Sequence, residues 1–390
     1  MRTCVCARDE LPHVPDVTLA GVGGRHSASR TGRPTERGQR GEVAAKLPRE
    51  CGSAAREPKA VRGVRLDKET GRDRYFAAKE RELEELLNPK TGMLSERFSR
   101  VIVCPLCESS QHTILFVKRG YPIVRCDECK LVFANPQVDE SLVLAEYRAD
   151  SARANDLWVD VLLSERQLEL DREKFQEILD ELEPYRGEGR LLDVGTSIGL
   201  FLRLALDRGW QAVGNEFGER ARQVASERFG LEVTDAPLDA MGVEPESFDV
   251  VTLNSVLEHV NEPRRMLAQI RGLLKPGGAL FVIVPNVDSL ACRILHERAA
   301  TFDGRNHLIY FSPRTLERML DAEGYDVVET HTRVASLDPV LEWLSYNEPY
   351  SGAPDDELAA ELRVRRGDVE RLLSELRLGY KLHCLARRRS

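Results

Sequence analysis

One stretch of this chain, from Leu191 to Leu202, constrains the fold more than any other. It reads as an apolar strand that ends in Asp193, a turn with glycines at 195 and 199, and an apolar helix. Glycine in such a turn lets the backbone approach a ligand, and the amides at the start of the helix offer hydrogen-bond donors. The G-x-x-x-G spacing lacks the glycine that a dinucleotide site reserves for pyrophosphate. The stretch therefore predicts a nucleotide-type ligand other than NAD or FAD.

Further strands of a parallel sheet follow this turn. The short run 211–215 precedes Glu216, a carboxylate placed to accept hydrogen bonds from both hydroxyls of a ribose. The runs 248–253 and 279–285 are rich in β-branched and apolar residues on both faces, as strands covered by helices on both sides must be. Together these runs predict an α/β fold.

The order of these motifs resembles that of the class I S-adenosylmethionine-dependent methyltransferases. The motifs are D-x-G-x-x-x-G from Asp193, the distal Glu216, F-D-V-V from Phe248, L-E-H-V from Leu257 and L-K-P-G-G from Leu274. The resemblance covers residues 190–389 and implies a Rossmann-like methyltransferase sheet of seven strands, in which the last strand is antiparallel. The catalytic domain is accordingly expected over 187–390.

The resemblance also implies which residues hold S-adenosylmethionine. The turn would surround the methionine part, Glu216 the ribose, and the segment from Thr234 to Leu238 the adenine. Ser197 departs from the family, which usually has glycine or another small residue there. Each residue also has a purely structural interpretation, as a turn cap, a packing glycine or a solvated acid. The predicted cofactor-binding set is Asp193, Gly195, Ser197, Gly199, Glu216, Asp235, Ala236 and Asn254.

Candidate catalytic residues are expected where the parallel strands end, because ligands bind at that edge of such a sheet. Glu258 and His259 follow the strand at 248–253, and His307 lies in an H-x-x-Y-F-S loop that resembles one in the same family. Histidine titrates near neutral pH and can serve as a base. His307 can equally be a buried residue bonded to backbone. Asn286, at the end of the strand 279–285, is a further candidate for contact with the acceptor or the cofactor.

Two other interpretations apply to the segment at 255–259. Ser255 and Glu258 have the spacing of a capping box, which is the favoured interpretation for Glu258. The segment also resembles the E-x-x-E-H run that binds a divalent cation in ubiquinone-type O-methyltransferases and small-RNA 2′-O-methyltransferases. Ser255 occupies the position of the first acid of that run, which argues against a catalytic metal.

A second strong motif precedes the catalytic domain. Two C-x-x-C pairs, separated by 18 residues, are typical of tetrahedral zinc coordination. Four thiolates leave no position open for water, so the zinc is expected to be structural. Cysteines used as metal ligands indicate a reducing compartment. The module, expected over 101–137, resembles the N-terminal zinc module of bacterial methyltransferases of lipopolysaccharide, sugar and secondary-metabolite pathways. The predicted zinc ligands are Cys104, Cys107, Cys126 and Cys129.

The rest of the chain is divided by composition. Residues 1–65 hold 13 Lys and Arg against 7 Asp and Glu, with almost no apolar periodicity, which predicts a disordered leader. A charged helical segment is expected over 66–100 and a helical connector over 138–186, in which Tyr147 is a candidate for reaching the cofactor. Two terminal strands, near 325–332 and 379–386, are separated by a helical, acidic insertion.

These features predict a cytoplasmic methyltransferase that uses S-adenosylmethionine and a structural zinc ion to methylate a small molecule by in-line transfer. A sugar, a lipid-linked compound or a secondary metabolite is the expected acceptor class. No apolar run approaches the ~20 residues needed to cross a bilayer, and the net charge of −8 argues against nucleic acid as partner. The alternatives are an RNA methyltransferase whose ribbon grips RNA, and a cofactor-binding protein without turnover. The oligomeric state is not predicted.

Overall fold

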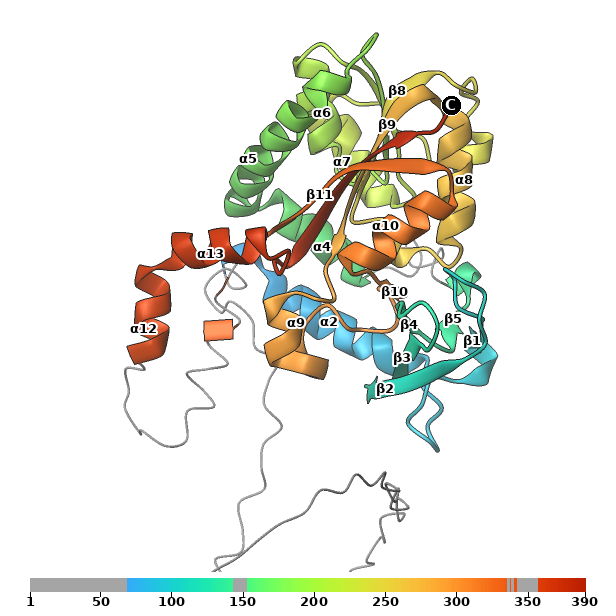
Figure 1. The fold of residues 1–390 in the computed structure, drawn as a ribbon, viewed down its shortest axis with the longest axis vertical. Coiled ribbons are helices and arrows are strands. Elements are labelled where there is room, and N and C mark those ends of the chain that lie inside the picture. Colours follow the sequence, from blue (N-terminus) through green and yellow to red (C-terminus); the bar gives the residue numbers. More distant parts are fainter. Residues whose placement is uncertain (1–68, 143–152, 335–336, 338–339, 342–356) are drawn as a thin grey trace, which may run out of the picture. The chain divides into compact units, whose positions relative to one another are not determined.

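A six-stranded sheet lies at the centre of the computed structural model, which describes residues 69–142, 153–334, 337, 340–341 and 357–390 (Figure 1). Its strand order is β11-β12-β9-β8-β6-β7. The last four strands in this order are parallel, and β12 lies antiparallel between β9 and β11. The strands are β6 (Arg190–Val194), β7 (Gln211–Asn215), β8 (Phe248–Asn254), β9 (Leu274–Pro285), β11 (Tyr325–Arg333) and β12 (Lys381–Arg388).

The sheet has the predicted topology, but the seventh strand is reduced to a single bridge. Thr234 pairs in parallel with Asn215 beside β7, and no further residue of that segment joins the ladder in the described part of the chain. The Thr234 hydroxyl accepts a hydrogen bond from the Ala236 amide, which turns the chain, and Pro237 has no amide hydrogen to donate. Local turn chemistry therefore ends this edge strand.

Helices cover both faces of the sheet. On one face lie α5 (Glu165–Leu182), α6 (Leu200–Asp207) and α7 (Glu219–Phe229), and on the other lie α8 (Pro263–Leu273) and α10 (Pro313–Ala322) (Figure 1). Alternate residues of the strands face the two layers. Val250 and Phe281 pack towards α5 and α6, whereas Val251 belongs to the core under α8 and α10. The strands are apolar on both faces for this reason.

Helix boundaries follow local sequence signals. The side chain of Ser312 accepts a hydrogen bond from the Thr315 amide and caps α10, which Pro313 begins. Gly230 ends α7 in a left-handed conformation.

Outside the central sheet, its covering helices and the zinc module lie further α-helices and two short strands. They are α2 (Arg72–Glu85), β1 (Ser99–Arg100), β5 (Gln137–Val138), α4 (Arg153–Leu163), α9 (Leu290–Leu295), α12 (Glu357–Val364) and α13 (Arg366–Glu375).

The zinc module is built into the rest of the molecule. Its hairpin, β2 (His112–Lys118) and β3 (Tyr121–Cys126), continues into β4 (Val132–Ala134), and a strand from far along the chain, β10 (Ile309–Tyr310), pairs with β4. The sheet order is β10-β4-β3-β2. The sheet of the module therefore extends beyond the predicted segment 101–137 and includes residues of the catalytic part.

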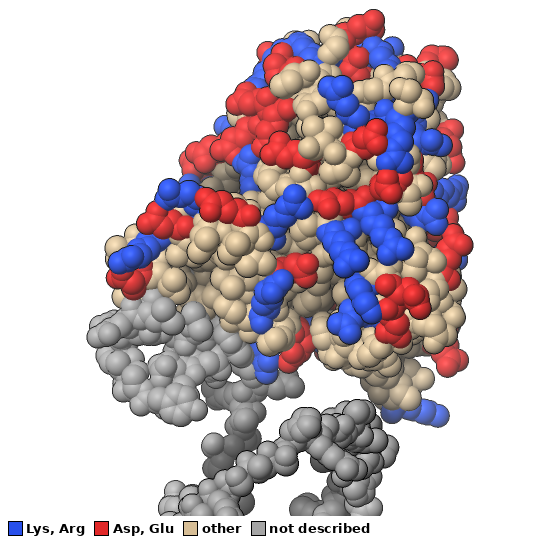
Figure 2. Space-filling model, viewed as in Figure 1, with Lys and Arg blue, Asp and Glu red and all other residues tan. Residues whose placement is uncertain are grey.

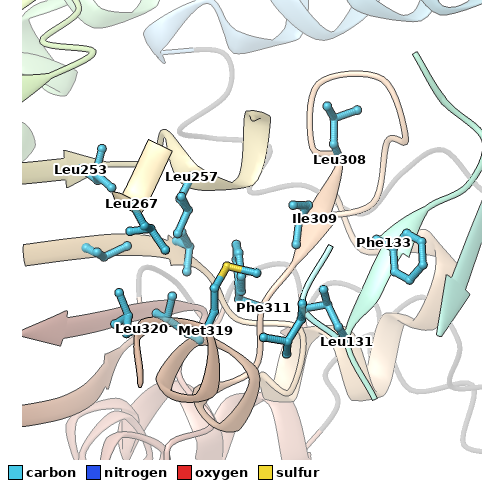
Figure 3. Close-up of a cluster of buried hydrophobic side chains, with 14 of the residues drawn as sticks. Leu131, Phe133, Leu253, Leu257, Leu267, Leu308, Ile309, Phe311, Met319 and Leu320 are labelled. Carbon is cyan, nitrogen blue, oxygen red and sulfur yellow. The ribbon is translucent and has the colours of Figure 1, made fainter. Parts of the chain in front are cut away.

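One hydrophobic core joins the module to the central sheet. Figure 3 shows Leu131 and Phe133 of the module in the same buried cluster as Leu257, Phe311 and Met319. All five are fully buried. The module thus has no separate core of its own on this side, and its packing is part of the packing of α10 and β8.

Charged side chains of both signs are mixed on the face drawn in Figure 2. Many of them pair, as Arg389 does with Asp321 and Asp326. Within the described ranges, no helix combines the length and the apolar character that crossing a bilayer requires. The basic leader and Tyr147 lie outside the described residues.

Candidate active site

Three predicted residues meet where the parallel strands end. Asp193 lies one residue before the end of β6, Glu216 directly follows β7, and Asn254 ends β8. The strand register pairs Asp193 with Gly214 on one side and with Thr252 on the other. The three polar side chains therefore belong to neighbouring strands at one edge of the sheet.

The turn after β6 needs unusual backbone angles. Gly195 has φ +69° and Gly199 has φ +81°, and a methyl group added at Gly199 would approach Leu231 Cδ1 to 2.6 Å. Ser197 also has a positive φ, of 53°, although it is not glycine. Its amide donates to Glu216 Oε2 at 2.9 Å. The departure from glycine at 197 is thus compatible with the turn.

Glu216 joins two loops at this edge. Its Oε1 accepts from the Gly218 amide at 2.7 Å and its Oε2 from the Ser197 amide. Burial, opposed by these amides and by Arg222, raises the pKa of Glu216 above its usual value. Each oxygen keeps a further lone pair, so the carboxylate can still accept hydrogen bonds from two hydroxyls.

Asp193 is buried beneath the turn. Its side chain accepts a hydrogen bond of 2.6 Å from the Thr252 hydroxyl, and burial raises its pKa to about 6. Asn215 holds the turn from the other side, since its Oδ1 accepts from the Gly195 amide and its Nδ2 donates to the Ala236 carbonyl. Sequence analysis missed Thr252 and Asn215, although polar residues inside apolar strands were a signal for both.

The predicted adenine residues lie beyond β7. Ala236 is half-buried and held by Asn215, whereas the Asp235 side chain is 71% exposed and lies 3.6 Å from Arg222 on α7. Asn254 is half-buried at the end of its strand. These positions surround the same edge, and their part in cofactor binding stays a prediction.

The three predicted catalytic residues form a cluster of Glu258, His259 and His307, called here the acid–histidine cluster. Their carboxylate and imidazole ligand atoms lie within 4.8 Å of one another, and the two rings are 4.8 Å apart between centroids. Residues almost 50 positions apart in sequence are therefore brought together. A methyl group added at Gly195 would come within 2.8 Å of Val256 Cγ2, so the segment leading to the cluster lies against the turn.

Hydrogen bonds fix both imidazole rings. His259 Nδ1 bonds to the Asn306 carbonyl at 2.8 Å, and His307 Nδ1 to the Thr301 carbonyl at 2.7 Å. A carbonyl can only accept, so each Nδ1 carries the proton and each Nε2 keeps its lone pair. Burial lowers the pKa of His259 to about 3 and that of His307, which Asp303 partly offsets, to about 4. Both rings are therefore neutral at pH 7.

The capping box expected at 255–258 does not form. Ser255 has a positive φ of 58°, and the chain makes only a short 3₁₀ helix, Leu257–His259, before α8 begins at Pro263. In the part of the chain that the structure describes, no other residue hydrogen-bonds to the Glu258 carboxylate, although Glu258 is only 1% exposed. Burial, opposed by the charge of Lys381, raises the pKa of Glu258 to about 7.

The loop that carries His307 is anchored by an ion pair that sequence analysis missed. Asp303 Oδ1 accepts from the amides of residues 305, 306 and 307, and Oδ2 accepts from Lys79 of α2 at 2.7 Å. Burial would raise the pKa of Asp303, but Lys79 and His307 hold it well below the usual range. The helix that precedes the zinc module thus fixes a loop of the candidate site.

Asn286 does not face a ligand. It is fully buried, its Nδ2 donates to the carbonyls of Arg377 and Gly379, and its Oδ1 accepts from the Asp288 amide. These bonds tie the end of β9 to the start of β12. The contact with acceptor or cofactor expected for Asn286 is therefore wrong.

The four predicted zinc ligands also come together. Their sulfur atoms lie within 4.8 Å of one another, with Cys104 and Cys129 at 3.4 Å and Cys107 and Cys126 at 3.5 Å. None of them forms a disulfide. Tetrahedral zinc with bonds of about 2.3 Å places its sulfurs roughly 3.8 Å apart, so this donor set fits the ion.

A comparison with protein families shows which family the residues of this sheet resemble. The family described as "Methyltransferase domain" matches residues 164–330. Residues 164–330 therefore match a methyltransferase family, and this match and the curated relatives support a class I S-adenosylmethionine-dependent methyltransferase. The matched residues include the turn at 193–199, Glu216 and the acid–histidine cluster.

Curated relatives are about one-third identical to the chain over the segments that they match. The chain is 33% identical over 127 residues to the ubiquinone biosynthesis O-methyltransferase of Stutzerimonas stutzeri, covering 28% of this chain and 55% of that protein. It is 37% identical over 110 residues to the protein of the same name from Roseobacter denitrificans, covering 27% and 44%. The chain thus spans about half the length of the curated relatives it matches.

Among solved structures, an S-adenosylmethionine-dependent methyltransferase from Archaeoglobus fulgidus is similar at 21% identity. The similarity covers 56% of this chain and 98% of that one, with a TM-score of 0.37. The four cysteines and β12 lie outside the residues that the methyltransferase family matches, on either side of them.

Proposed function

We propose that this protein transfers the methyl group of S-adenosylmethionine to a hydroxyl oxygen of a small-molecule acceptor. The observation that carries the proposal is the contact between two sites. Val256 lies against the turn at Gly195, so the acid–histidine cluster adjoins the edge of the sheet that carries the predicted cofactor-binding residues. The names of the relatives, which are O-methyltransferases, support oxygen as the acceptor atom.

When bound, S-adenosylmethionine would supply a methyl group on a sulfonium, and the acceptor oxygen, on losing its proton, would displace the sulfur, which keeps the electron pair of the carbon–sulfur bond. Glu216 would hold the ribose through the remaining lone pairs of its oxygens, and Asp193 lies beneath the turn. Holding the reacting atoms in line supplies a large part of the rate.

The acid–histidine cluster orients the acceptor and takes its proton. Both Nε2 lone pairs are free to accept a hydrogen bond, because each Nδ1 is bound to a carbonyl. Glu258 is the better base at neutral pH, since a base works best when its pKa is near the working pH, and burial raises its pKa to about 7. The four cysteines hold a structural zinc ion, which supplies stability to the module and closes its own coordination sphere.

Binding and transfer are tested separately. Calorimetry of the purified, zinc-loaded chain is expected to detect S-adenosylhomocysteine binding, and Glu216→Gln is expected to weaken it 10-fold or more, since a charged hydrogen bond contributes about 1.5–3 kcal/mol. Glu219→Gln, an exposed neighbour on α7, is the matched control. Tritiated methyl donor, offered with a panel of phenolic, sugar and lipid-linked hydroxyl compounds, then tests transfer. Absence of cofactor binding by the unaltered chain contradicts the proposal.

RNA as acceptor is the second candidate, and the surface of the zinc module counts against it. Arg119 pairs with Glu80, and Lys118 and Lys130 donate to the carbonyls of Ala299 and Asp127. Three of its basic side chains are thus engaged within the protein, whereas RNA binding depends on free cations for phosphates. Retention of the chain on RNA at moderate salt would reverse this choice.

A further inference from the structure

Lys381 enters the candidate site from a strand that the methyltransferase family match does not include. It is the first residue of β12, which runs antiparallel to β9, and it pairs with Pro285 at the end of β9. The start of β12 therefore lies at the edge where the parallel strands end. Its ammonium donates to Ser255 Oγ at 3.0 Å.

Lys381 and Glu258 interact electrostatically. The charge of Lys381 lowers the pKa of Glu258 against the effect of burial, and the carboxylate in turn raises the pKa of Lys381, which burial lowers overall. Yet, among the described residues, no group outside Glu258 itself hydrogen-bonds to its two carboxylate oxygens. Leaving a buried carboxylate unpaired is costly, so a polar group beyond the described residues is needed to complete the site.

Other charges near Lys381 come from two helices. Asp171 of α5 raises its pKa, whereas Lys174 of α5 and Arg72 of α2 lower it. Lys174 donates to Asp171 at 2.8 Å and is therefore already paired. Around Lys381, the carboxylate that lacks a partner in the described part of the chain is that of Glu258.

We propose that the ammonium of Lys381 binds the acceptor oxygen as it loses its proton, and that the acceptor is an acidic hydroxyl of the phenol or enol class. This inference rests on the proposed function. The proton passes to the Glu258 carboxylate, the electron pair of the O–H bond stays on oxygen, and Lys381 remains protonated beside the new oxyanion. No oxidant or further reactant is required.

A single positive charge is sufficient for this role. An opposite charge within about 4–6 Å lowers the pKa of an acid by about 1–3 units, which brings the pKa of a phenolic hydroxyl from about 10 down to about 7–9. Ser255 holds the ammonium in place, and the neutral imidazoles add no competing positive charge. The residue that replaces an acid in the E-x-x-E-H run is thus the one that positions a cation of the protein itself.

The test uses 4-nitrophenol, whose anion absorbs visible light. Full-length, zinc-loaded protein is saturated with S-adenosylhomocysteine, and the bound probe is titrated with pH. In the unaltered protein and in Lys381→Arg, the acid dissociation constant of the bound probe is expected to be about 10-fold higher than that of the free probe in water. In Lys381→Met and Lys381→Gln, this increase is expected to be lost. Lys90→Met is the control, because Lys90 is exposed and distant in sequence from Lys381.

The outcomes separate this inference from the proposed function. Equal ionisation of the probe by Lys381→Gln and the unaltered protein overturns it, as does failure of the unaltered protein to bind the probe, or ionisation that appears only after Mn²⁺ is added. In each of these cases intact binding of S-adenosylhomocysteine leaves the proposed function standing. If the unaltered chain does not bind that nucleoside, the proposed function itself fails. Lys381→Arg keeps the test valid should the neutral variants not fold.

Discussion

Replacing Glu258 by glutamine should change the pH dependence of stability. The carboxyl of Glu258 has an ordinary pKa of 4.5, and burial without a hydrogen-bond partner raises it to about 7 in the folded chain. Because the folded pKa is the higher one, the folded state binds more protons between these values. Stability associated with this group is therefore complete below about pH 4.5 and is lost as the pH rises towards 7.

The size of the effect follows from the shift. One pKa unit corresponds to about 1.4 kcal/mol, so ionising Glu258 costs the folded state about 3 kcal/mol at pH 8 and about 1 kcal/mol at pH 5. Glutamine cannot ionise, and its own burial cost is the same at both pH values. Glu258→Gln is therefore expected to gain about 2 kcal/mol relative to the unaltered chain between pH 5 and pH 8.

The assay is urea unfolding of both proteins at the two pH values, with the zinc ion retained and the free energy of unfolding extrapolated to water. Glu244→Gln replaces an exposed carboxylate and is the matched control, expected to differ from the unaltered chain by the same small amount at both pH values. A difference for Glu258→Gln that does not change with pH would refute the reasoning, since the buried carboxylate would then be no more costly than an exposed one.

Two further perturbations test the zinc module and the anchored loop. Cys104→Ser is expected to reduce bound zinc, measured by elemental analysis, from one ion per chain to a small fraction. Cys384→Ser should leave the zinc content unchanged, because Cys384 lies in β12 and is not one of the four clustered cysteines. Lys79→Met should cost about 3 kcal/mol of unfolding free energy, because it leaves Asp303 without its cation; Lys90→Met should cost less than about 0.5 kcal/mol. Equal zinc contents, or equal stabilities of the two lysine variants, would contradict these expectations.

Much of the fold could be predicted because its signals are local. The apolar run from Leu191 and the glycines after Asp193 predicted a strand and a helix, which are β6 and α6 in the structure. Ser312 and Pro313 predicted the start of a helix, which the structure confirms as α10. The resemblance to the methyltransferase family, carried by the order of the motifs, implied the sheet and its antiparallel last strand. The seventh strand that the resemblance implied is only a single bridge at Thr234, because a side-chain hydrogen bond turns the chain there.

The supporting residues of the site could not be predicted, because their partners are distant in sequence. Lys79 lies 224 residues before Asp303, and Lys381 lies 126 residues after Ser255. Nothing in the local pattern of either lysine differs from that of a solvated surface residue. The capping box at Ser255 was a wrong prediction because the spacing alone does not report the positive φ that prevents a helix from starting there.

The pairing of β10 with β4 links metal content to the acid–histidine cluster. His307 lies two residues before β10, and the Leu308 amide donates to the Glu258 carbonyl while the Leu308 carbonyl accepts from the Ala134 amide of β4. A chelator that removes the zinc ion and loosens β4 would therefore displace the loop that carries His307 but leave the turn at 193–199 in place. Such a protein would keep its nucleoside affinity yet lose turnover, and would behave in kinetic studies as a zinc-dependent enzyme although the ion never meets a reacting atom.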